Sequence, residues 1–170
     1  MVDGMPASAE FEPLLAALVR GARDHYGPRL CGVAVYGSVA RGEAGRASDV
    51  DLLVVADELP RGPMKRLKDF EAVEAVGEVE AEVAKLRRRG FRAEISPMIW
   101  SPAALGVFSY LHLDLATDAR ILFDPERMLE TRLARVRQRM AELGTRRVPH
   151  RGTYYWVLKP GMKPWEEIDI

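Results

Sequence analysis

The sequence predicts an α/β or α+β domain in which helices flank a small sheet. Short, apolar, β-branched runs bounded by turn residues alternate with longer stretches in which apolar residues recur every three or four positions. The length of 170 residues is that of one domain with room for a short appendage. We therefore expect one domain over residues 1–147 and a C-terminal extension over residues 148–170, packed on or beside it.

The predicted elements follow each other in a regular order. They are a helix over 10–26, strands over 30–36 and 49–56, a helix over 60–89, a strand over 91–100, a short helix from Ser101, a strand over 120–123, a long helix after Pro125 and a strand over 153–158. Gly27-Pro28 ends the first helix, and Gly90 ends the second long one, which Gly77 bends. Ser101-Pro102 has the cap and first-turn residues of a helix start.

Composition and charge exclude several classes of protein. Lys and Arg total 25, as do Asp and Glu, so the net charge is zero and bulk binding of nucleic acid is not expected. The sequence has no run of about 18 apolar residues, so no membrane span is expected, and it has no N-terminal apolar segment of the kind that predicts a signal peptide. The single Cys31 cannot form an internal disulfide, which fits a reducing cytoplasm. Three scattered histidines do not have zinc-site spacing.

Two aspartates in the second predicted strand are the first candidate functional residues. Asp49 and Asp51 are two apart, so on a strand their side chains lie on the same face. Neighbouring carboxylates repel each other and resist burial unless cations neutralise them. Mg²⁺ suits such a pair, because it takes one or two protein carboxylates and completes its shell with water and phosphate oxygens.

A glycine-rich turn precedes this pair by about ten residues. The first predicted strand runs into Gly37-Ser38, where glycine lets the backbone approach a ligand and the serine hydroxyl joins free N–H groups to bind an anion. Adjacent strands would bring this turn to Asp49 and Asp51. A phosphate site beside a site for metal ions about 3.5–4 Å apart is what transfer of a nucleotidyl group needs. Neither a Walker loop nor a dinucleotide fingerprint is present.

These residues carry a family resemblance. Gly37-Ser38, ten intervening residues and Asp49-Val50-Asp51 resemble the signature of the DNA polymerase β nucleotidyltransferase superfamily, and the string GSVARGEAGRASDVDLLV resembles its minimal prokaryotic members. The likeness is strong over 33–55 and looser over SPMIW, LDLATDARILFD and YYWVLKP. It implies a mixed sheet with flanking helices, and Mg²⁺-dependent transfer of a nucleoside monophosphate, AMP from ATP.

The resemblance also implies roles for individual residues. Gly37 and Ser38 would hold the phosphates, with Arg41 neutralising their charge, and Asp49 and Asp51 would bind two Mg²⁺ ions. The family usually has a third carboxylate, on a following strand, which acts as general base. Glu94 is the candidate here, both as a catalytic residue and as a third metal ligand beside Asp49 and Asp51, although the commoner residue is Asp. Asp114 and Asp118 are weaker rivals.

Three functions remain open from the sequence. Small relatives resemble the antitoxin of a two-gene pair, which adenylylates a tyrosine of a HEPN-domain ribonuclease toxin, so a HEPN-type partner is one expectation. Antibiotic nucleotidyltransferases share the motif, but the Arg-rich helix after Pro125 does not suit a cationic drug. The third reading is a non-catalytic nucleotide- or partner-binding module. The nucleotide base, the acceptor and the oligomeric state stay open.

Overall fold

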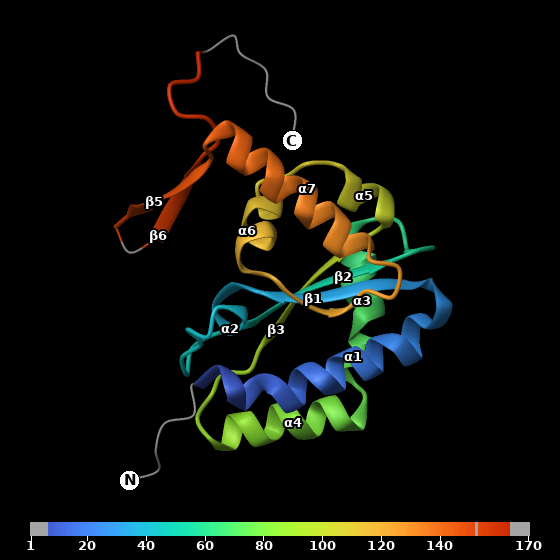
Figure 1. The fold of residues 1–170 in the computed structure, drawn as a ribbon. Helices are drawn as coiled ribbons and strands as arrows, with labels where there is room; N and C mark the ends of the chain where they lie inside the picture. The colour runs from blue at the N-terminus through green and yellow to red at the C-terminus, as the bar shows by residue number, and fades with distance from the viewer. Residues whose placement is uncertain (1–6, 152, 164–170) are drawn as a thin grey trace.

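A four-stranded mixed sheet forms the centre of the molecule, with helices on both faces (Figure 1). The structure is a computed structural model that describes residues 7–151 and 153–163. β1 (Leu30–Tyr36) pairs antiparallel with β2 (Val50–Ala56) and with β4 (Arg120–Phe123), and β2 pairs parallel with β3 (Ile95–Trp100), giving the order β3-β2-β1-β4. The predicted fold class is confirmed.

The sheet is buried on both faces, which explains why its two central strands are apolar throughout. On one face α1 (Glu12–Tyr26), α3 (Pro63–Glu74) and α4 (Gly77–Arg88) pack over a core that includes Val33, Val35, Leu52 and Val54. On the other, α5 (Pro102–Gly106), α6 (Leu111–Asp118) and α7 (Met128–Leu143) cover the sheet. Within the described residues no helix is long and apolar enough to cross a membrane.

The prediction of one helix over residues 60–89 is wrong, because two helices occupy this stretch. α3 ends at Glu74, and Val76 takes an extended backbone with ψ 125° before α4 begins at Gly77. Val73 and Val79 are buried on either side of the break. Both helices bury their apolar stripe against the same core, so the apolar spacing of three to four residues continues from α3 into α4. This spacing therefore does not indicate the break between them.

Several predicted boundaries shift by a few residues. The first helix is preceded by a 3₁₀ turn over Ala7–Phe11. β3 begins at Ile95 rather than Phe91, since Ala93 has a φ of +49° and the Arg92 N–H donates to Arg46 O at 2.7 Å instead of to a strand. α7 begins at Met128, after a turn in which the Asp124 carboxylate accepts from two backbone N–H groups of the helix. The predicted Ser101 cap is confirmed, since its Oγ accepts from the Ala104 N–H.

A two-stranded hairpin follows α7. It consists of β5 (Arg146–His150), which the sequence pattern did not predict, and β6 (Thr153–Val157). Trp156 and Leu158 pack against a small core formed by α6 and α7. The predicted domain boundary between residues 147 and 148 falls inside β5, and the part of the predicted extension from residue 164 onward lies outside the described residues.

Candidate active site

Asp51 lies at the start of β2, and Asp49 immediately precedes this strand, which begins at Val50 rather than at the predicted residue 49. Val50 and Leu52 pack into the core on the α1 side, whereas Leu53 packs into the core on the α7 side. Because side chains alternate along a strand, Asp51 and the preceding Asp49 face the α6–α7 side. Burial, and then the nearby charge of Asp49, raise the pKa of Asp51 above its usual value, which makes the pair electrostatically costly without a cation.

Gly37 places the glycine-rich turn directly against Asp51. The turn is the short helix α2 (Gly37–Ala40), which begins where β1 ends, and Tyr36 pairs with Asp51 in the β1–β2 register. Gly37 has a φ of +70°. A Cβ added there would lie 3.1 Å from Asp51 Cγ and would overlap Asp51 Oδ2. Only glycine therefore allows the backbone to approach this carboxylate so closely.

A cavity of about 310 Å³ opens in front of this contact. Its lining residues are Tyr36, Gly37, Ser38, Arg41, Asp51, Asp114 and Tyr154. The sequence-predicted turn residues Gly37, Ser38 and Arg41 thus share one cavity with Asp51. Such a cavity, with backbone and hydroxyl donors on one side and carboxylates on the other, suits a phosphate that binds together with a cation.

Two carboxylates of α6 connect this cavity to the C-terminal hairpin. Asp118, whose side chain is only 6% exposed, accepts from Arg41 at 3.0 Å and from Arg147 of β5 at 2.7 Å. Asp114 accepts from the Tyr154 hydroxyl at 2.8 Å and from Trp156 Nε1 at 3.0 Å. From the sequence, both aspartates are only rivals of Glu94 for the third carboxylate. Their i, i+4 spacing, which puts them on one helix face, was the available signal.

Glu94 lies outside the cavity that contains Asp51. It immediately precedes β3, its side chain is 52% exposed, and Arg92 binds it at 2.5 Å. The same guanidinium reaches Asp49 Oδ1 at 3.4 Å, so Arg92 spans both carboxylates. The described residues contain no group of three or more His, Cys, Asp or Glu side chains placed to hold a metal ion together.

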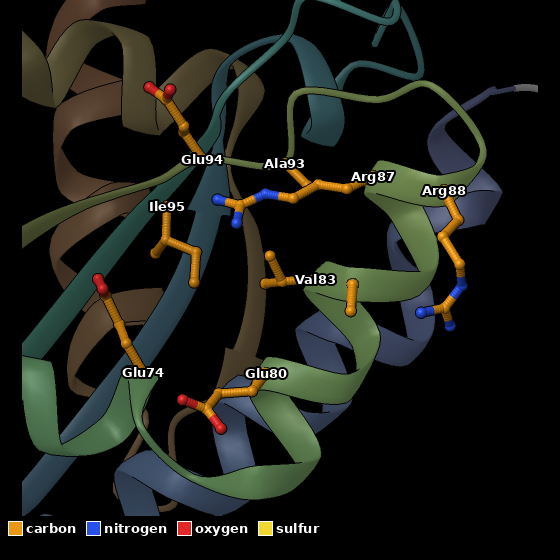
Figure 2. A pocket seen from close by; sticks show the side chains of 9 residues that line it. Glu74, Glu80, Val83, Arg87, Arg88, Ala93, Glu94 and Ile95 are labelled. Carbon is orange, nitrogen blue, oxygen red and sulfur yellow. The ribbon is translucent and has the colours of Figure 1, made fainter.

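Glu94 lines a separate cavity of about 630 Å³, which lies between α4 and the start of β3. Figure 2 shows Val83, Arg87 and Ile95 bordering it, while the Glu94 carboxylate points away from them. This direction agrees with the strand parity, which puts Glu94 on the face of Asp49 and Asp51. The larger cavity therefore does not contain the paired aspartates.

Comparison with known proteins decides the family. The model of the nucleotidyltransferase domain family matches residues 18–125. The chain belongs to this family. A Methanocaldococcus jannaschii protein named "Putative protein adenylyltransferase" is 29% identical over 126 residues, which cover 73% of this chain and 79% of that protein.

Two examples represent the solved structures that are similar to this nucleotidyltransferase. One, a toxin–antitoxin with AMP-PNP, is 16% identical and covers 76% of this chain and 92% of that chain with a TM-score of 0.49. The other is a tri-AMPylated Shewanella oneidensis HEPN toxin in complex with MNT antitoxin. It is 12% identical, and the match covers 77% of this chain and 90% of that chain with a TM-score of 0.45.

The residues of this nucleotidyltransferase fit the divalent metal that its family uses. Asp49 Oδ1 is buried and accepts no hydrogen bond, its closest described cation being Arg92 at 3.4 Å. An unsatisfied buried carboxylate oxygen is costly unless a ligand completes it. Together with the half-buried Asp51, it supplies the hard oxygen donors that Mg²⁺ prefers.

Proposed function

We propose that this nucleotidyltransferase moves AMP from ATP, with Mg²⁺, to a hydroxyl group of a protein. The observation that carries the proposal is the contact of the Gly37 backbone with Asp51, inside a cavity that Ser38 and Arg41 also line. A phosphate held by the turn is thereby held next to a carboxylate. Such placement favours transfer because it fixes the reacting groups before the chemical step.

Each site residue has a distinct proposed task. Ser38 and the backbone at Gly37 would hold phosphate oxygens, and Arg41 would neutralise their charge. Asp49 and Asp51 would hold two Mg²⁺ ions, which supply positive charge against the triphosphate and make the acceptor hydroxyl more acidic. Glu94 would serve as the third carboxylate, and the single guanidinium that spans Asp49 and Glu94 supports this role because it places both acids within reach of one cation.

A tyrosine of a HEPN-type ribonuclease toxin is the proposed acceptor, which makes this chain an antitoxin. The name of the Methanocaldococcus jannaschii relative supports a protein acceptor and adenylyl as the group transferred. The resemblance of residues 33–55 to minimal nucleotidyltransferases supports the HEPN-type partner. Arg41 lines the cavity and already binds one anionic group, the Asp118 carboxylate at 3.0 Å, which supports an anionic donor at this turn.

The test is transfer of label from α-labelled ATP to the product of the adjacent gene, co-expressed and purified with the enzyme. Mg²⁺-dependent labelling of a tyrosine is expected, and Asp49→Asn/Asp51→Asn should abolish it. The matched control is Asp24→Asn/Asp57→Asn, which makes the same charge change at exposed positions away from the cavity and should leave labelling intact.

The outcomes separate the proposal from its alternatives. Full transfer in Asp49→Asn/Asp51→Asn would contradict the mechanism. Calorimetric binding of ATP and Mg²⁺ without pyrophosphate release, even with the neighbouring protein present, would favour a non-catalytic binding module. Label on a nucleotide-accepting small molecule but on no protein would overturn the proposed acceptor class while leaving the chemistry in place.

A further inference from the structure

Tyr154 of β6 lines the same cavity as the phosphate turn and Asp51. Its hydroxyl donates to Asp114 Oδ1 at 2.8 Å, and Asp114 also lines the cavity. The Arg147 guanidinium lies 4.2 Å from the centre of the Tyr154 ring, a cation–π contact that fixes the ring from the neighbouring strand. A tyrosine hydroxyl is therefore held in the candidate active site by the chain itself.

The alternation of the hairpin singles out Tyr154 from its neighbour. Tyr154 and Trp156 both reach Asp114, whereas Tyr155, between them, is 51% exposed and does not line the cavity. Because side chains of a strand alternate between its faces, this difference follows from position and not from residue type. Tyr155 is thus a matched control for the same chemical group on the same strand.

The hydroxyl of Tyr154 also has a base beside it. Burial and the hydrogen bond to Asp114 raise the pKa of Tyr154, so the phenol is protonated at neutral pH. A protonated phenol becomes a competent nucleophile when a positioned carboxylate takes its proton during attack. Asp114 occupies that position in the structure.

We propose that Tyr154 is an intramolecular acceptor, so that the enzyme adenylylates itself; this inference rests on the proposed function. The phenolic oxygen of Tyr154 forms a bond to the α-phosphorus of ATP, and the bond from that phosphorus to the oxygen bridging to the β-phosphate breaks. Pyrophosphate leaves with this oxygen, and the phenolic proton passes to Asp114. The products are a tyrosine–AMP phosphodiester and pyrophosphate, with no oxidant or further reactant.

Adenylylation would also change how the hairpin is held. It removes the proton that Tyr154 donates to Asp114 and puts a phosphodiester charge beside that carboxylate. Like charges at this separation repel, so the contact between β6 and α6 weakens after modification. The Arg147–Asp118 ion pair at 2.7 Å remains as a second attachment of the hairpin.

The test is incubation of the purified full chain with ATP and Mg²⁺, followed by intact-mass measurement and peptide mapping. We expect one adenylyl group per chain, located on Tyr154, and no gain in mass for Asp49→Asn/Asp51→Asn. Tyr154→Phe, which keeps the ring and its packing, should lose the modification, and Tyr155→Phe should keep it at the wild-type level. An unmodified wild-type chain, or a modified Tyr154→Phe chain, would overturn the proposal.

Two further measurements make the result specific. The fraction modified per unit time should not depend on protein concentration if the acceptor belongs to the same chain, and a rate that rises with concentration would overturn the intramolecular step. Labelling of the adjacent-gene product is measured in parallel. Label on that product with none on Tyr154 removes only this inference, whereas absence of label from both, together with absence of pyrophosphate release, removes the proposed function as well.

Discussion

Replacing Gly37 with alanine tests the central contact of the site. Two costs follow from the structure. The φ of +70° is left-handed, which costs an L-residue about 1–2 kcal/mol, and the added methyl group would overlap Asp51 Oδ2 and lie 3.1 Å from Asp51 Cγ. Because the methyl meets the end of a side chain rather than backbone, Asp51 can move aside. The fold therefore survives, but the carboxylate leaves its place.

Gly144→Ala is the matched control. Gly144 has a φ of +68°, nearly that of Gly37, but the closest atom to an added Cβ is Pro160 Cδ at an ordinary 3.7 Å. Both variants should lose a similar free energy of unfolding, about 1–2 kcal/mol, which lowers the Tm of a domain this size by roughly 2–8 °C. Only Gly37→Ala carries the additional displacement of Asp51.

The assay is Mg²⁺-dependent transfer from α-labelled ATP, with thermal unfolding measured on the same preparations. A displacement of about 1 Å in a catalytic constellation costs on the order of 10²-fold in rate, so we expect that loss in Gly37→Ala and near wild-type transfer in Gly144→Ala. Transfer by Gly37→Ala at the rate of Gly144→Ala would refute the argument that the turn must touch Asp51. The argument would also be refuted if the loss of transfer in each variant equalled the fraction of that variant that is unfolded.

Three other outcomes follow from the site and the core. Asp51→Asn should raise the Tm at neutral pH in the absence of divalent metal. The pKa of Asp51 is raised in the folded state, so its ionisation destabilises the fold as pH rises through that pKa. A lower Tm would contradict this. Glu94→Gln should lower transfer by about 10²-fold or more while calorimetry shows ATP binding unchanged, as expected of a general base, and a loss confined to binding would reassign it. Burial raises the pKa of both Tyr26 and Tyr36 to about 12, so an ultraviolet titration should find two phenols that titrate near pH 12, besides Tyr154, whose pKa is also raised. The stability that Tyr26 and Tyr36 contribute below pH 10 should be lost between pH 10 and 12.

The central sheet could be predicted because its signal is local. The strands predicted over residues 30–36 and 120–123 match β1 and β4 with the same bounds. A short apolar run between turn residues fits few secondary structures other than a strand. The helix break at Val76 could not, because both helices bury the same kind of stripe against the same core. β5 could not either, since Arg146–His150 is mostly charged and polar and depends on contacts distant in sequence, namely pairing with β6 and the Arg147–Asp118 ion pair.

The same distinction applies to the site. Gly37, Ser38 and Asp51 are brought together by the β1–β2 register, which antiparallel neighbours impose once both strands are recognised. Asp114 and Tyr154 reach the cavity only through the docking of α6 and the hairpin, a tertiary contact between residues forty apart. No spacing rule predicts such a contact, so the second half of the cavity becomes visible only in three dimensions.

The charges around the cavity argue that nucleotide and metal bind as a unit. Asp118 holds Arg41 and Arg147, and Arg92 is bound by Asp49 and Glu94, so each of these guanidinium groups already has a carboxylate partner. Asp51 forms no ion pair with these three side chains in the contacts above. Burial and then the charge of Asp49 raise its pKa, and the nearby Arg41 charge offsets them only in part. A triphosphate entering alone would meet carboxylates at short range in a partly desolvated cavity, where like charges repel strongly. Affinity for ATP should therefore depend steeply on Mg²⁺, and Asp51→Asn should weaken that dependence rather than simply weaken binding.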